Sequence, residues 1–290
     1  MILITGATGN IGAALVHQLD AHDVALRVLV RGPVRAGGLP ERIERALGDL
    51  TVPATLESAF TGVQKLFLLT QGIGTDQAAN AIAAAHAAGV RHIVFISSYS
   101  VLTEPLPAMA RWHHAREALL AASGIPSTVL RPTGFMTNTF EWLPTLAEGG
   151  FVIDAVGPGR LAPIDPADIA AVAAHVLTTP EHDGKAYAPT GGESFTIAEQ
   201  VNILASVIGR PMTIRTAASP EETVRSRFPN GASPELAAAI IEGFHLMRED
   251  TVGFRTSDVR NLLGREPATF ADWCTRNATV FQHAIDQVRS

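Results

Sequence analysis

The first half of the chain alternates between short apolar runs and longer stretches with helical spacing. Most of the apolar runs are rich in Val, Ile, Leu or Phe, which predicts strands buried on both faces. These runs are Ile2 to Thr5, Ala25 to Val30, Lys65 to Thr70, His92 to Ser97 and Ser127 to Leu130, with a further short strand expected over Arg42 to Leu47. Helices are expected over Ile11 to Leu19, Asp76 to Ala88 and Met109 to Ala122, with Gly89 and Gly124 as left-handed caps of the last two. Strands joined by such helices pair in parallel through right-handed crossovers, so the pattern predicts an α/β fold with a doubly wound, Rossmann-type sheet.

After Pro132 the alternation of apolar runs and helical stretches becomes less regular, and glycine-rich breaks separate shorter segments. Helices are expected here over Asp165 to Leu177, Thr196 to Ile208, Pro220 to Arg227, Pro234 to Met247 and Phe270 to Ala284. We therefore expect residues 1–132 to form the sheet domain and residues 133–290 to form a smaller, mostly helical cap. Some segments of the cap should return to the sheet. Neither a repeat nor a linker of like charges is visible, which favours a cap packed on the first domain.

Composition narrows the class of protein. Of 290 residues, 47% are hydrophobic and 17% are charged, a balance that excludes a disordered or collagen-like chain. The net charge of -6 leaves no basic surplus for binding nucleic acid. The single cysteine, Cys274, excludes an intrachain disulfide and fits a reducing compartment. The start of the chain lacks the pattern of a signal peptide, and apolar stretches such as Ile169 to Leu177 are too short to span a membrane. We expect a cytoplasmic protein with no membrane or nucleic-acid partner.

A glycine-rich turn follows the first predicted strand and opens the first helix. Gly6 can take the tight turn, Gly9 lets a diphosphate approach the backbone, and Gly12 lets the helix lie close to the sheet. The helix N-terminus offers N–H groups and partial positive charge to phosphates. Thr8, Asn10 and Ile11 complete this predicted dinucleotide site, whose alternative is a glycine turn without a ligand.

Arginine stands at the end of the second strand, where the adenosine ribose of a bound dinucleotide is expected. A carboxylate there would suit NAD, but Arg31 and Arg35 can clamp a 2′-phosphate. These residues favour NADP(H), with NAD(H) as the alternative cofactor and solvated loop charges as the alternative reading. Asp49 and Leu50, after the next strand, could flank the adenine or form a plain turn.

Several motifs together resemble the NmrA-like branch of the atypical short-chain dehydrogenase/reductases. They are Gly6-Ala7-Thr8-Gly9-Asn10-Ile11-Gly12, Arg31, Gly48-Asp49-Leu50, Ile96-Ser97-Ser98, Leu130-Arg131-Pro132 and the stretch from Ala162 to Ala170 that holds Asp165 and Asp168. The resemblance covers almost the whole chain, including the region from Arg265 to Phe270. It implies an NADP-binding fold and a function among NAD(P)H-dependent quinone and azo-dye reductases, isoflavone-type reductases and nonenzymatic NADP sensors.

The resemblance also implies an active-site serine near Ser97 or Ser98, and a Tyr with a Lys four residues later on the next helix. Met109 and His113 stand where that pair is expected, and neither tyrosine of the chain has such a lysine. Without a strong positioned acid, hydride transfer to quinones, azo bonds, enones or imines is favoured over reduction of ordinary ketones. His113 could relay a proton near neutral pH or be structural.

The ligand crevice of a doubly wound sheet lies at the carboxyl ends of its strands. We expect Thr70, Gln71 and Pro132 to contact the cofactor there. The expected substrate walls are Tyr99, Gly134, Phe135, Met136, Phe140 and Trp142, although the aromatic cluster could instead be core of the cap. Asp165 and Asp168 are expected to start a helix rather than transfer protons. No metal-ligand spacing is present. The sequence thus predicts an NADPH-dependent oxidoreductase acting on a small conjugated molecule, as a monomer or homodimer; a noncatalytic NADP-binding redox sensor is the alternative.

Overall fold

A seven-stranded sheet forms the centre of the first part of the chain. The computed structural model describes residues 1–22, 24–32, 38–228, 230–249 and 253–286. The strands of this sheet are β1 (Ile2–Ile4), β2 (Leu26–Val30), β3 (Glu44–Leu47), β4 (Lys65–Leu68), β5 (His92–Ile96), β6 (Ser127–Leu130) and β8 (Ala186–Tyr187). All neighbouring pairs are parallel, as the alternation of strands and helices predicts.

The strand order places a switch point at the middle of the sheet. The order is β3-β2-β1-β4-β5-β6-β8, so the chain first moves outward from β1 and then returns to the other side of β1 as β4. A crevice for a ligand is expected outside the carboxyl ends of the strands at such a point. The glycine turn follows β1, and Leu69 and Thr70 follow β4.

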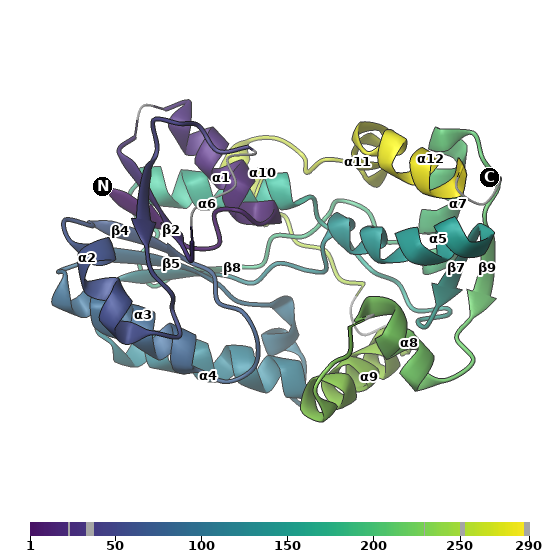
Figure 1. The fold of residues 1–290 in the computed structure, drawn as a ribbon, viewed down its shortest axis with the longest axis horizontal. Helices are drawn as coiled ribbons and strands as arrows, with labels where there is room; N and C mark the ends of the chain where they lie inside the picture. The colour runs from purple at the N-terminus through teal and green to yellow at the C-terminus, as the bar shows by residue number, and fades with distance from the viewer. Residues whose placement is uncertain (23, 33–37, 229, 250–252, 287–290) are drawn as a thin grey trace.

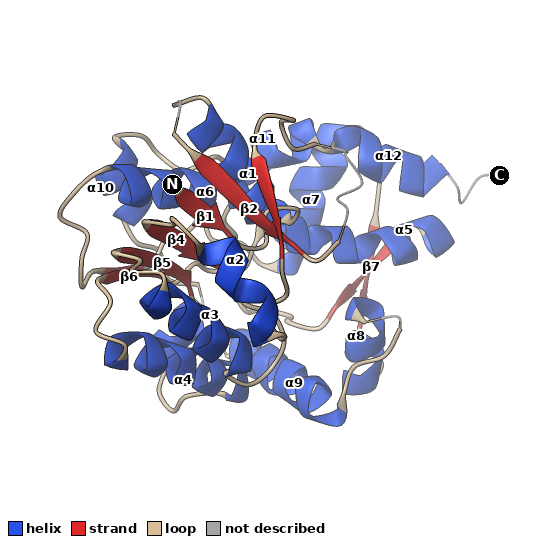
Figure 2. Cartoon of the chain, turned by 60° about the vertical axis from the view of Figure 1, so that its left-hand side comes forward, coloured by secondary structure: helices blue, strands red, loops and turns tan. Residues whose placement is uncertain are grey.

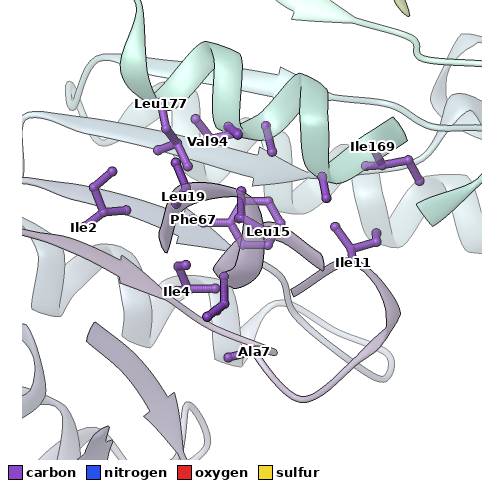
Figure 3. Packing of buried hydrophobic residues seen from close by; sticks show 14 of the residues in the cluster. Ile2, Ile4, Ala7, Ile11, Leu15, Leu19, Phe67, Val94, Ile169 and Leu177 are labelled. Carbon is purple, nitrogen blue, oxygen red and sulfur yellow. The ribbon is translucent and has the colours of Figure 1, made fainter. Parts of the chain in front are cut away.

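Helices cover both faces of the sheet (Figures 1 and 2). One face carries α1 (Asn10–Asp20), α6 (Pro166–Thr178) and α10 (Asp258–Leu263), and the other carries α2 (Leu56–Phe60), α3 (Asp76–Ala87) and α4 (Ala108–Ala122). Figure 3 shows the core on the first face, where Leu15 and Leu19 of α1 lie beside Phe67 and Ile11 lies near Ile169 of α6. The first face therefore depends on α6, a helix from beyond residue 132.

A second body stands at the carboxyl edge of the sheet, to the right in Figure 1. It contains β7 (Phe151–Asp154) paired in parallel with β9 (Thr213–Thr216), and the helices α5 (Leu143–Gly149), α7 (Ile197–Ile208), α8 (Pro220–Arg227), α9 (Pro234–Arg248), α11 (Phe270–Arg276) and α12 (Ala278–Asp286). Its core is a separate cluster that includes Trp142, Phe270 and Phe281. Three short 3-10 helices, η1 (Pro53–Thr55), η2 (Tyr99–Leu102) and η3 (Met136–Trp142), complete the described elements.

The fold class and the main elements expected from the sequence are confirmed. Gly89 and Gly124 both have φ near +70°, as their capping role requires. Asp165 caps the start of α6 by accepting a hydrogen bond from the amide of Ala167, so its expected structural role is confirmed. The single helix expected over Phe270 to Ala284 is wrong: the segment forms two helices, because α11 ends at Arg276 and is capped by Asn277, whose side chain donates to the carbonyl of Trp273.

Candidate active site

The glycine turn between β1 and α1 brings the two elements into close contact. Gly6 has φ of +65°, a conformation that favours glycine. A Cβ added to Gly12 would lie 2.2 Å from the carbonyl oxygen of Gly6, so only glycine fits there. A Cβ added to Gly9 would meet nothing nearer than that oxygen, at 3.4 Å. Gly12 is therefore required by the fold, whereas Gly9 leaves open space above the turn.

The N-terminus of α1 is suited to phosphate. Gly9 is its N-cap, and no side chain of the described residues caps its first turn. Thr8, Gly9 and Asn10 are exposed, while Ile11 is buried in the core and anchors the helix. The side chain of Asn10 donates a 3.1 Å hydrogen bond to the hydroxyl of Thr137, which ties the turn to η3. An uncapped helix start beside an open glycine fits the diphosphate of a dinucleotide.

The residues expected around the adenosine end lie at the ends of β2 and β3. Arg31 is exposed after β2. The Asp49 carboxylate accepts hydrogen bonds from the backbone N–H and the hydroxyl of Thr51, and these bonds, with the charge of Arg31, lower its pKa. Leu50 is buried, and its carbonyl accepts a bond from Asn80. Asp49 is thus part of a turn whatever its role toward adenine. Arg35 lies outside the described residues.

A cavity of about 430 Å³ opens at the carboxyl ends of β4, β5 and β6, between the sheet and the second body. Both Met109 and His113, the residues that stand where a Tyr and a Lys were expected, line it. So do Thr70, Ser97, Ser98, Tyr99, Pro132, Gly134, Phe135 and Trp142 from the set predicted by sequence. The structure therefore brings together, around one cavity, most of the residues that were expected at the strand ends to contact the cofactor or the substrate.

Three of the expected residues do not line this cavity. Met136 is 2% exposed and belongs to the core of the second body. The ring of Phe140 lies 5.2 Å from that of Trp273 and 5.6 Å from that of Phe281, so it is also core. The expectation that Met136 and Phe140 form substrate walls is corrected, because their apolar side chains serve packing. Gln71 lies exposed in the loop after β4, where its amide donates to the side chain of Gln77.

The two serines after β5 have different surroundings. Ser97 is buried, and its hydroxyl donates to the carboxylate of Glu117 on α4. Ser98 accepts hydrogen bonds from the backbone N–H and the hydroxyl of Ser100, which start η2. The hydroxyl proton of Ser97 is thus already engaged, which leaves Ser98 as the better placed of the two to contact a ligand.

His113 is a neutral imidazole at the cavity wall. Burial, with a contribution from Arg116, lowers its pKa to about 4. Its Nδ1 is buried and has no hydrogen-bond partner among the described residues, and the same holds for the hydroxyl of Thr70. This lowered pKa disfavours the expected relay of a proton by a charged His113 near neutral pH. His113 can instead donate a hydrogen bond as a neutral group.

Tyr99 and its surroundings close one side of the cavity. Its ring lies 5.8 Å from that of Phe254, and burial raises the pKa of its phenol to about 12. The phenol therefore stays protonated at neutral pH and can donate a hydrogen bond but not act as a base.

Three polar residues of the cavity were missed in the sequence. Glu141 and Arg227 line it and form an ion pair with 3.2 Å between Nε and Oε1. Gln200 of α7 also lines it and is 3% exposed. The available signal was the position of Gln200 on the apolar face of its helix, between Ile197 and Leu204.

Comparisons with known proteins decide the family. A family model described as NAD(P)H-binding matches residues 6–180, which span the glycine turn and most of the sheet. The chain belongs to this NAD(P)H-binding family. It is 35% identical to (4-alkanoyl-5-oxo-2,5-dihydrofuran-3-yl)methyl phosphate reductase of Streptomyces griseus, covering 97% of this chain and 99% of the relative. It is 33% identical to NAD(P)H azoreductase of Xenophilus azovorans, again covering 97% and 99%.

A solved structure agrees with these relatives. The NADPH-dependent quinone oxidoreductase of Escherichia coli, in complex with NADPH, superposes with a TM-score of 0.82 at 30% identity, covering 95% of this chain and 99% of that one. The resemblance to NmrA-like reductases and the binding of NADP(H) expected from the sequence are confirmed. The described residues contain no helix long and apolar enough to cross a membrane, and no group of His, Cys, Asp or Glu side chains arranged to hold a metal ion.

Proposed function

We propose that this protein is an NADPH-dependent reductase that transfers hydride to a conjugated, electron-poor acceptor such as a quinone, an azo compound, an enone or an imine. The observation that carries the proposal is the pair Met109 and His113 at the wall of the cavity. Neither supplies a strong acid, because methionine has no acidic proton and His113 is neutral at pH 7. Such a site suits acceptors whose reduced form spreads its negative charge and takes a proton from water.

The names of the relatives support the same class of chemistry. A (4-alkanoyl-5-oxo-2,5-dihydrofuran-3-yl)methyl phosphate reductase, an azoreductase and a quinone oxidoreductase are all similar to this chain over nearly its whole length. The acceptors in these names differ, so they favour a conjugated acceptor as a class rather than one compound.

The residues of the chain have separable tasks in this reaction. The open turn at Gly9 and the start of α1 would hold the diphosphate, and the bound NADPH supplies the hydride. Phe135 and Trp142 form apolar walls that would hold a flat acceptor and exclude water. The neutral imidazole of His113 would donate a hydrogen bond to the acceptor atom on which negative charge develops. A second electron carrier is not needed, because hydride and one proton from water complete the two-electron reduction.

The composition of the chain bears on where the protein acts and on its partners. We infer a cytoplasmic protein that acts on a small molecule, as a monomer or homodimer, without nucleic-acid or membrane partners. The net charge of -6 and the single cysteine support this setting. We also propose that residues 1–132 are the NADP-binding domain and residues 133–290 the cap. The separate hydrophobic cluster of the second body supports that division, and α6, β8 and α10 are cap segments that return to the sheet domain.

The test is oxidation of NADPH against a panel of acceptors. We expect turnover with quinones, azo dyes or enones and much weaker turnover with simple aliphatic ketones. Deuterium from labelled NADPH should appear in an enone product, which identifies direct hydride transfer. Robust ketone reduction with inactive quinones would overturn the proposal. Tight NADPH binding without turnover of any acceptor would favour a redox sensor.

A further inference from the structure

Two helices from different parts of the chain each place at the cavity wall a residue that has one buried, unpartnered side-chain nitrogen. These atoms are Nδ1 of His113 on α4 and Nε2 of Gln200 on α7. Both residues line the cavity, and neither nitrogen has a hydrogen-bond partner among the described residues. Buried polar groups are nearly always paired, because leaving one unpaired costs about 1–3 kcal/mol. Two such residues in the wall of one cavity point to a ligand that pairs with both side chains once it is bound.

The position of Gln200 is one where packing alone calls for an apolar residue. Its neighbours on the same face of α7, Ile197, Val201 and Leu204, are buried in the core of the second body. The start of the helix is held by a capping box in which Thr196 and Glu199 exchange hydrogen bonds. The amide therefore cannot leave the cavity wall by fraying of the helix.

Several other polar groups at the cavity are already engaged, and the hydroxyl of Thr70, which also has no partner among the described residues, follows β4 on the sheet side of the cavity. Glu141 and Arg227 pair with each other, and Ser97 donates to Glu117. Gln200 is uncharged, so it suits a neutral oxygen better than an anionic group. An amide also offers both a donor and an acceptor, so it can pair with a carbonyl before reduction and with a hydroxyl afterwards.

We propose that Gln200 is a specificity residue that binds an oxygen of the acceptor remote from the one that faces His113. The preferred acceptor is then a conjugated molecule with oxygens at two ends, as in a quinone, rather than an enone with one carbonyl. This inference rests on the proposed reductase function.

The experiment compares two acceptors across three proteins. The acceptors are para-benzoquinone, with two opposed oxygens, and cyclohexenone, with one. The proteins are the wild type, Gln200→Met, which keeps the length of the side chain without its polar end, and Asn202→Met, a matched control that replaces an exposed amide on the same helix. The Kd for NADPH and the thermal unfolding midpoint are measured for each.

We expect Gln200→Met to raise KM for para-benzoquinone about tenfold, which corresponds to the loss of one hydrogen bond to a ligand. The KM for cyclohexenone and the Kd for NADPH should change little, and Asn202→Met should resemble the wild type. The unfolding midpoint of Gln200→Met should stay the same or rise, because an apolar side chain replaces an unpaired buried amide. An equal effect on both acceptors, a lower unfolding midpoint or no change in either KM would overturn the proposal.

A binding measurement separates this proposal from the proposed function. Trp142 lines the cavity, so its fluorescence should be quenched when para-benzoquinone binds the complex with NADP⁺. If the wild type turns over no acceptor, the reductase function fails, but a weaker quinone affinity in Gln200→Met alone would still support the role of Gln200. If the wild type is active and both proteins bind the quinone equally, only the role of Gln200 fails.

Discussion

Arg131 holds the carboxylate of Glu117 with two hydrogen bonds, from Nε to Oε1 at 3.1 Å and from Nη2 to Oε2 at 2.6 Å. Arg131 follows β6 and Glu117 lies on α4, so this ion pair fixes the helix to the carboxyl end of the sheet. Ser97, at the end of β5, donates to the same carboxylate. His113 lies one turn before Glu117 on the same helix. The ion pair between Arg131 and Glu117 therefore positions the part of the cavity wall that carries His113.

Removal of Glu117 should therefore destabilise the protein. The side chains of Glu117 and Arg131 are only 11% and 25% exposed, so Glu117→Ala leaves a partly buried guanidinium unpaired. We expect a loss of about 2–3 kcal/mol in the free energy of unfolding. Urea denaturation measures it. Glu266→Ala, which breaks a pair with Arg260 that is 58% and 68% exposed, should cost less than about 0.5 kcal/mol. Equal effects of the two substitutions would contradict the assignment.

Gly9 and Gly12 should respond differently to substitution. Gly9→Val should leave the fold intact, because its Cβ side is open, but place methyl groups where the diphosphate must approach. Gly12→Val should unfold or strongly destabilise the protein, because its Cβ would lie 2.2 Å from the carbonyl oxygen of Gly6. Circular dichroism and NADPH titration separate the two effects. A folded Gly9→Val protein with normal NADPH affinity would show that the diphosphate lies elsewhere.

Arg31 should set the preference for NADPH over NADH. It is exposed at the end of β2, where its side chain can reach a 2′-phosphate. Arg31→Ala should weaken NADPH binding by about 1.5–3 kcal/mol and leave NADH binding nearly unchanged. Arg91→Ala, which removes an exposed charge before β5, controls for the change in net charge. Fluorescence titration of both cofactors checks this, and equal wild-type affinities would refute it.

The sheet and the glycine turn were predictable because their signals are local. The buried strands are continuous apolar runs, and the roles of Gly6 and Gly12 follow from backbone geometry within seven residues. The pair formed by Phe151–Asp154 and Thr213–Thr216 was not predicted, because the second strand is exposed at every position and has only one apolar residue, Ile214. Its pairing depends on contacts far apart in the chain.

The candidate site was predictable where residues follow strand ends, and not where the second body contributes. Thr70, Ser98 and Gly134 were placed by the rule that ligands bind at the carboxyl ends of strands. Met136 and Phe140 were misassigned because an apolar residue gives the same signal in a core as in a pocket. Gln200 was overlooked, although a polar residue on an apolar helix face is the one signal that could have pointed to it.

The last prediction concerns acid stability. His113 has a pKa of about 4 in the fold, against about 6.5 when exposed in the unfolded chain. The unfolded state therefore binds more protons between these values, and the free energy of unfolding falls as pH drops from about 6.5 to about 4. Burial also lowers the pKa of His92 and His182, which adds to the loss. Each pH unit in this window corresponds to about 1.4 kcal/mol for His113.

Comparison with His113→Gln isolates that contribution. The wild type should lose about 1.5 kcal/mol more than the variant between pH 6.5 and pH 5, as urea denaturation at the two values can show. The wild-type kcat/KM for a quinone should have no inflection near pH 6.5, because the imidazole is already neutral there. Turnover in the variant should fall by less than the roughly 10²–10⁴-fold typical of a general acid, since only a hydrogen bond is altered. An inflection near pH 6.5 that vanishes in His113→Gln would instead make His113 a titrating proton donor, because no neutral hydrogen-bonding group can produce it.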